Sequence, residues 1–232
     1  MADLTLIIGN KNYSSWSLRP WLLLRHAGIE FDEVRVPLFE TGYKEAILRY
    51  SPAGKVPALI DRGLVIWDSL AICEYIAEKF PAQRLWPADW RTRARARSAC
   101  AEMHSGFSAL RTHMPMNIRA HLPGRGMRPD VRADIDRICA IWSDCRAIYA
   151  ANAETAPGQP PAEDFLFGHF TCADAMYAPV CSRLLTYGVD LPDAARRYVL
   201  AITSLPAMQE WINAAKLEQE IIEEDEPYRA QP

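Results

Sequence analysis

The chain has 232 residues, half of them hydrophobic, so it is long enough to bury the cores of two small domains. Its net charge is only −3, with acidic and basic residues interspersed, which argues against a nucleic-acid-binding protein. It has no run of about 18 apolar residues and no signal-peptide pattern, so we expect a cytoplasmic protein that does not enter a membrane.

The first 80 residues alternate between strand and helix patterns. Strands are predicted at residues 4–8, 31–36, 57–60 and 64–66, and helices at 18–27, 43–49 and 69–80. Pro20 favours a start for the first helix at or just before Ser17, because proline fits best in the first helical turn, and Gly28 ends that helix. Residues 61–63 carry a hairpin signal. We therefore expect an α/β module with a mixed sheet covered by helices.

From Trp90 onward the strand signals disappear. Helices are predicted at about 90–121, 129–152, 172–187, 192–202 and 205–217, followed by an acidic tail at 218–232. Pro115 is expected to kink or break the first of them, and residues 152–161 are expected to form a loop. Thr171 and Asp174 fit a capping box, with a structural role at the start of their helix. This part of the chain is therefore predicted to be all-helical.

Six cysteines and five histidines occur without the spacing of a metal or redox motif. No Cys-x-x-Cys pair is present, and the cysteines lie mostly among apolar or helical neighbours. We expect reduced cysteines packed in helices and no bound metal.

The segment 51–59, Ser-Pro-Ala-Gly-Lys-Val-Pro-Ala-Leu, feeds a proline into the start of a strand. Proline is tolerated in a sheet only at an edge, a first residue or a bulge. We predict a cis Val56–Pro57 bond that exposes the Val56 backbone to a bound peptide. Asp68 and Ser69 then open a helix, whose N-terminus favours a ligand carboxylate. Together these features predict a pocket for a small, extended, acidic peptide.

These residues resemble the glutathione-binding half of glutathione transferases, through Lys-Val-Pro-Ala-Leu at 55–59 and Asp-Ser-x-Ala-Ile-x-Glu-Tyr-Ile at 68–76. The segment 12–19, Asn-Tyr-Ser-Ser-Trp-Ser-Leu-Arg, resembles the serine-type start of that superfamily, nearest the zeta and theta classes. The resemblance implies the glutathione transferase architecture, with a thioredoxin-like α/β N-terminal domain at 1–81 and an all-α C-terminal domain at 90–232. It also implies a homodimer.

The resemblance assigns a catalytic role to Ser14, which lies five residues before Arg19. In zeta and theta enzymes the corresponding serine stabilises the glutathione thiolate. A free thiol of this kind has a pKa of about 8.5, so an enzyme that uses it as a nucleophile must favour the anion. Tyr13 and Ser15 stay as alternatives, because tyrosine-type classes place a phenol nearby and Ser15 is one residue away.

Five further residues are expected to bind glutathione. By the resemblance, Lys55 pairs with the glycyl carboxylate, and Val56, held by Pro57, exchanges backbone hydrogen bonds with the cysteinyl unit. Asp68 meets the γ-glutamyl ammonium, whereas Ser69 and its amide hold the γ-glutamyl carboxylate.

The pocket for the electrophile is expected between the two modules. The loop around Tyr13 and Trp16 and the helix near residues 104–117 would line it. The candidates on that helix are His104, Phe107, Arg111, Met114 and Met116, and its methionines would suit varied apolar substrates.

Three functions follow from these expectations. The first is an enzyme that conjugates glutathione to a small electrophile. The second is a glutathione-dependent cis–trans isomerase of the maleylacetoacetate isomerase type. Ser-Ser-Trp-Ser resembles the Ser-Ser-Cys-Ser of that zeta class, although Trp16 replaces the cysteine. The third is a non-catalytic glutathione-binding interaction module, because fold does not fix function.

Overall fold

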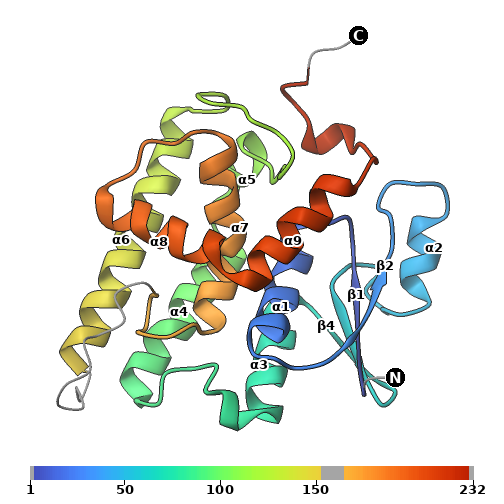
Figure 1. Ribbon diagram of the computed structural model, residues 1–232, viewed down its shortest axis with the longest axis horizontal. Helices are drawn as coiled ribbons and strands as arrows, with labels where there is room; N and C mark the ends of the chain where they lie inside the picture. The colour runs from blue at the N-terminus through green and yellow to red at the C-terminus, as the bar shows by residue number, and fades with distance from the viewer. Residues whose placement is uncertain (1–2, 153–164, 230–232) are drawn as a thin grey trace.

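The computed structural model describes residues 3–152 and 165–229, and it combines a four-stranded sheet with a larger set of helices (Figure 1). The loop expected at 152–161 lies, from residue 153 on, outside the described residues. None of the described helices is long and apolar enough to cross a membrane. All six cysteines are free thiols, and all but Cys139 are buried, as the sequence predicted.

The sheet contains β1 (Leu4–Ile8), β2 (Asp32–Arg35), β3 (Ala58–Asp61) and β4 (Leu64–Trp67), in the order β2-β1-β3-β4. Strand β1 is parallel to β2 and antiparallel to β3, which forms the predicted hairpin with β4. Helices α1 (Ser15–His26) and α2 (Tyr43–Leu48) connect the strands, and α3 (Ser69–Lys79) follows β4. The expected mixed sheet with covering helices is therefore confirmed.

The start of α1 differs from its prediction. The helix begins at Ser15 rather than near Ser17, and Ser14 is its N-cap. Pro20 therefore lies inside the helix, where its missing N–H removes one internal hydrogen bond. The apolar residues of α1 are almost fully buried, so tertiary packing outweighs the local preference of proline for the first turn.

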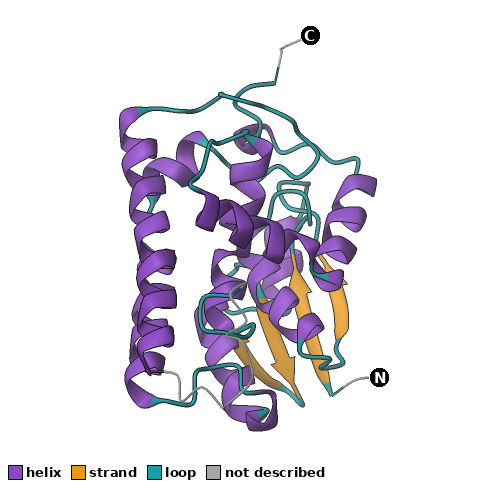
Figure 2. Cartoon of the chain, turned by 60° about the vertical axis from the view of Figure 1, so that its left-hand side comes forward, coloured by secondary structure: helices purple, strands orange, loops and turns teal. Residues whose placement is uncertain are grey.

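The second part of the chain forms helices joined by loops, with no strand among its described residues. It contains α4 (Trp90–Ser105), α5 (Ser108–His113), α6 (Pro129–Asn152), α7 (Cys172–Thr186), α8 (Asp193–Ser204) and α9 (Pro206–Leu217), with short 3₁₀ turns η1 (Pro81–Gln83) and η2 (Glu223–Asp225). Figure 2 shows the strands, in orange, at the lower right of the molecule, with helices over and beside them and in most of the remaining structure. The all-helical prediction is confirmed.

The expected break at Pro115 is confirmed, since α5 ends at His113, but the structure has an earlier break that was not predicted. The helix that starts at Trp90 ends at Ser105, and Gly106 and Phe107 separate α4 from α5. Phe107 adopts a left-handed conformation with φ 60°, which no helix can continue. Its side chain is buried, so packing of the ring compensates for the backbone strain at this position.

Helix α1 joins the two parts of the molecule. It packs against β1 and α3 on the sheet side, and against α7 and α9 on the helical side. One hydrophobic core accordingly runs from Leu6 of β1 to Met176 of α7. A smaller cluster, which includes Ile7 and Ile47, lies between the opposite face of the sheet and α2. The loop before α1 is thereby held where the sheet meets the helices.

The capping box at the start of α7 is confirmed. Thr171 accepts a hydrogen bond from the Ala173 amide, and the buried Asp174 carboxylate accepts one from the Thr171 amide. Asp174 also accepts hydrogen bonds from the Leu166 amide and the Tyr198 hydroxyl. Burial raises the pKa of the Asp174 carboxyl, although these hydrogen bonds oppose the rise.

Candidate functional site

Ser14 lies at the N-terminus of α1 and is only 7% exposed. Its hydroxyl lies 2.8 Å from the Ser17 hydroxyl, which in turn accepts a hydrogen bond from the Gly9 amide at the end of β1. The Ser17 amide also points to Ser14 Oγ, at 3.4 Å. The sheet and the first turn of α1 therefore fix the position of the Ser14 hydroxyl.

Ser15 has a different partner. Its Oγ accepts a hydrogen bond of 3.3 Å from Nη2 of Arg183, a buried arginine of α7. The guanidinium also donates to the Met114 carbonyl at 2.9 Å. Arg183 thus ties the first turn of α1 to the helical part of the chain.

The phenol of Tyr13 is occupied by the C-terminal segment. It hydrogen-bonds the Glu226 carboxylate and accepts a bond of 2.7 Å from Arg119 Nη2. Burial raises the pKa of the Tyr13 phenol, and the hydrogen bond to Glu226 adds to the rise. Tyr13 therefore holds its proton more firmly than a free tyrosine does.

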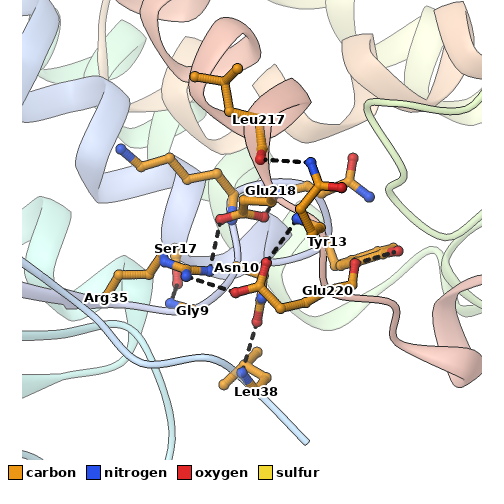
Figure 3. Close-up of polar contacts among 12 residues, drawn as sticks. Gly9, Asn10, Tyr13, Ser17, Arg35, Leu38, Leu217, Glu218 and Glu220 are labelled. Atoms are coloured by element: carbon orange, nitrogen blue, oxygen red, sulfur yellow. Dashed lines mark hydrogen bonds and ion pairs between the residues drawn. The ribbon is translucent and has the colours of Figure 1, made fainter. Parts of the chain in front are cut away.

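The C-terminal segment is docked on the loop that carries Ser14 (Figure 3). The Glu218 carboxylate accepts hydrogen bonds from the Lys11 amide at 2.7 Å and the Asn12 amide at 3.0 Å, and it pairs with Arg35 at 3.2 Å. Arg35 also pairs with Glu220 at 2.7 Å. The acidic tail of the sequence therefore helps to hold the candidate site.

Replacing Glu218 by glutamine should destabilise the protein by about 1–3 kcal/mol, because its amide nitrogen cannot accept the second backbone N–H. The midpoint of thermal unfolding should fall by about 2–4 °C for each kcal/mol. Glu223→Gln is the control, since Glu223 is exposed in the same segment. Equal midpoints for both variants would show that the segment does not stabilise the loop.

The Val56–Pro57 peptide bond is cis, which confirms the predicted geometry of this bond. Val56 precedes β3, and within the described chain its backbone N–H and C=O have no hydrogen-bond partner. Pro57 is buried, whereas Lys55 is exposed and forms no ion pair with the described residues. An unpaired backbone at the edge of a cavity can take up a further extended chain.

Asp68 and Ser69 begin α3 as predicted. Asp68 caps the helix through the Leu70 amide and has a positive φ of 76°, which is uncommon for a residue other than glycine. Ser69 is 1% exposed, and its hydroxyl has no partner in the described part of the structure. A buried hydroxyl without a partner is costly, so a ligand group is favoured there.

Two adjacent cavities gather these residues. One of about 490 Å³ is lined by Val56, Pro57, Asp68, Ser69 and His104. The other, of about 520 Å³, is lined by Tyr13, Ser14, Ser15, Phe39, Arg111, Arg183 and Asp225. Trp16, Lys55 and Val56 line both of them. All eight site residues predicted from the sequence therefore lie around one continuous region. We call the cavity of about 490 Å³, beside Ser69, the peptide cavity, and the cavity of about 520 Å³, beside Ser14 and Arg183, the arginine cavity.

The prediction of which residues line the electrophile pocket is partly wrong. His104 and Arg111 line the cavities, and His104 Nε2 lies 3.3 Å from Asp68 Oδ2. Phe107, Met114 and Met116 are instead buried in the core and line neither cavity, because the predicted long helix is interrupted after Ser105. The wall is therefore basic rather than rich in methionine.

Sequence reasoning missed Ser17, Arg183 and Asp225. Ser17 offers a third hydroxyl in the motif of Ser14 and Ser15, but the resemblance selects Ser14 and gives Ser17 no role. Arg183 could have been noticed as the one basic residue of α7, a helix made mainly of apolar and small residues. Asp225 gives no signal, because it enters the arginine cavity only when the C-terminal segment folds back. No group of three or more possible metal ligands is found in residues 3–152 and 165–229.

Comparison with known proteins agrees with this architecture. Residues 13–79 match the model of the glutathione S-transferase N-terminal domain, and residues 88–214 match that of the C-terminal domain. A glutathione transferase homologue from Burkholderia with bound glutathione is 22% identical, with a TM-score of 0.60 over 92% of this chain and 97% of that chain. Glutathione transferase Omega 2S from Trametes versicolor is 20% identical, with a TM-score of 0.66 over 92% and 95%. These structures share the thioredoxin-like plus all-helical fold.

Curated relatives match over shorter segments. A probable maleylacetoacetate isomerase of Caenorhabditis elegans is 35% identical over 96 residues, which cover 41% of this chain and 44% of that protein. A zeta-class glutathione S-transferase of Euphorbia esula is 33% identical over 105 residues, which cover 45% and 47%. The match thus spans about half the length of these relatives. Because the two domain models together cover most of the sequence, this chain belongs to the glutathione S-transferase family.

Proposed function

We propose that the protein is a glutathione transferase that stabilises the glutathione thiolate through the Ser14 hydroxyl for attack on a small electrophile. The observation that carries this proposal is the pair of unpartnered polar groups in the peptide cavity, the Val56 backbone and the Ser69 hydroxyl. This cavity joins the one that Ser14 lines. A tripeptide bound along Val56 can therefore place its central thiol near Ser14.

Each end of glutathione has a suitable partner. The Val56 N–H and C=O exchange hydrogen bonds with the cysteinyl unit, as an added strand does. Ser69 and the N-terminus of α3 bind the γ-glutamyl carboxylate, and Asp68 meets the adjacent ammonium group. Lys55, free of any ion pair with the described residues, attracts the glycyl carboxylate.

The geometry supports Ser14 over Tyr13 as the thiolate ligand. A hydroxyl can rotate, so Ser17 can donate to Ser14 Oγ while Ser14 donates to the sulfur. The Gly9 amide holds Ser17 in place for this relay. The Tyr13 phenol is instead engaged by Glu226 and Arg119.

Glutathione affinity tests the peptide site. Ser69→Ala should weaken binding by about 10- to 150-fold, the value of one hydrogen bond to a charged group. The midpoint of thermal unfolding should not fall, because the Ser69 hydroxyl has no partner in the described chain. Ser98→Ala is the control, since that hydroxyl bonds only its own helix at Ala94. Equal glutathione affinities of the two variants, measured by titration calorimetry, would contradict the proposed binding mode.

Two activity assays separate the candidate reactions. Relatives named maleylacetoacetate isomerase favour the isomerase as the second candidate. Turnover of 1-chloro-2,4-dinitrobenzene supports conjugation, whereas turnover of maleylacetone supports the isomerase. Silence in both assays, together with tight binding of glutathione, would favour a non-catalytic binding module and contradict our proposal.

A further inference from the structure

Three arginines from separate helices lie at the first turn of α1, where Arg183 contacts Ser15 and the other two contact Trp16. Arg19 of α1 is 0% exposed, Arg183 of α7 is 4% exposed, and Arg111 of α5 is half-buried. The guanidinium carbons of Arg19 and Arg111 lie 4.1 and 4.6 Å from the Trp16 ring centroid. Burial and the neighbouring positive charges lower the pKa of Arg183 to about 10, and they lower that of Arg19 well below its usual value. Positive charge is therefore concentrated here at an energetic cost.

Arg19 is the arginine whose guanidinium most clearly lacks hydrogen-bond partners. None of its three guanidinium nitrogens forms a hydrogen bond with the described residues. The side chain lies behind Trp16 and does not line the arginine cavity. It therefore raises the positive potential of the cavity from behind, without touching what binds there.

Arg183 and Arg111 do line the arginine cavity, and their hydrogen bonds go to neutral groups. Arg183 donates to Met114 O, to Pro179 O at 3.4 Å and to Ser15 Oγ at 3.3 Å, which leaves one N–H on each terminal nitrogen. Arg111 donates to carbonyls at the end of α4 through Nε and Nη2, including Gly106 O at 3.0 Å. Its Nη1 has no bond to the described chain.

No carboxylate of the described residues lies within ion-pair distance of Arg19, Arg111 or Arg183. Asp225 is the one acid in the described lining of the arginine cavity. Burial raises the pKa of Asp225 to about 6, against the opposing effect of Arg183, so Asp225 is still mostly ionised at neutral pH. The described lining thus holds four basic residues, Lys44, Lys55, Arg111 and Arg183, against this one acid.

We propose that the arginine cavity binds an electrophile that carries a carboxylate, with Arg111 and Arg183 as its ligands. Arginine donors in a fork match a carboxylate in geometry and charge. This inference rests on the proposed function, because it takes the electrophile to lie beside the thiolate at Ser14. The carboxylate is held and not consumed. In the test reaction below, the sulfur bonds to carbon and chloride leaves with the electron pair of the C–Cl bond.

A matched pair of electrophiles tests this inference. 4-Chloro-3,5-dinitrobenzoate and its methyl ester differ in charge, and each catalysed kcat/KM is divided by the uncatalysed rate constant with glutathione. We expect the acid to be favoured by about 10- to 100-fold, the value of a hydrogen-bonded charge. Arg111→Met should remove most of this preference, which is read as the ratio of the acid to the ester, so that any loss of rate common to both compounds cancels. Arg91→Met, an exposed arginine remote from both cavities, should keep the preference.

Arg183→Lys is the second variant, because it keeps the charge in a buried position but loses the fork. It should reduce the preference less than Arg111→Met does. An alternative anion in the same place is the glutathione sulfur itself. In that case Arg111→Met would shift the pKa of bound glutathione and slow both electrophiles equally, which would overturn our inference.

A binding measurement separates this inference from the proposed function. Titration calorimetry without glutathione measures directly the affinity of the acid and of the ester for the arginine cavity. If the acid binds more tightly than the ester, and Arg111→Met abolishes this difference, the anion site is supported. If the protein at the same time conjugates neither compound, the proposed transferase function is refuted. Equal binding of the two compounds, or no binding of either, would overturn the anion site whatever the enzyme does.

Discussion

Ser14→Ala should lower turnover with glutathione at neutral pH by about 10- to 150-fold, the value of a hydrogen bond to a charged sulfur. The Ser14 hydroxyl is held by Ser17 at the N-terminus of α1, so its proton and the helix dipole both favour the thiolate. Glutathione affinity should change little, because Val56, Asp68 and Ser69 provide most of the anchoring. Loss of the N-cap should cost about 1 kcal/mol of stability.

The thiolate absorbance of the binary complex, titrated against pH, measures this effect. In Ser14→Ala the pKa of the bound thiol should rise toward that of free glutathione. Ser17→Ala should give a smaller rise, because it removes the relay but leaves the Ser14 hydroxyl. An unchanged titration in Ser14→Ala, with the shift lost in Ser15→Ala or Tyr13→Phe, would move the role to that neighbour. If none of the three matters, activation by a hydroxyl is refuted.

Asp174→Ala should reduce the free energy of unfolding by about 3–5 kcal/mol, because several buried donors lose their acceptor together. The amides of Leu166 and Thr171 and the Tyr198 hydroxyl all donate to this carboxylate. None of these groups reaches water, since Asp174 is fully buried. The thermal midpoint should fall by about 6–20 °C.

Thermal unfolding monitored by circular dichroism checks this expectation. Asp190→Ala is the control, because the Asp190 side chain is 94% exposed and forms only a surface pair with Arg196. The loss of stability in Asp174→Asn should lie between those of Asp174→Ala and Asp190→Ala, since an amide keeps one acceptor oxygen. A loss of less than 1 kcal/mol for Asp174→Ala would mean that the neighbouring groups find other partners.

The sequence determined most of the local structure of this protein. The period of apolar residues placed α6 and α9 within about a residue of their observed ends, and Thr171 with Asp174 marked the start of α7. The cis bond before Pro57 and the cap at Asp68 were also predicted. These features depend on hydrogen bonds and sterics between residues close in the chain, so they can be read without knowledge of the fold.

The tertiary structure alone decided how distant residues share a site. Arg19, Arg111 and Arg183 come from three helices. The packing of α1 against α7 buries Arg19 and Arg183, and Arg111 of α5 reaches the Trp16 ring. The carboxylate of Glu218 likewise meets the Lys11 amide across 207 positions of sequence. Packing also moved the start of α1, since burial of its apolar face outweighs the local cost of Pro20. Burial and long-range electrostatics depend on which surfaces meet, and no local pattern in the chain encodes that.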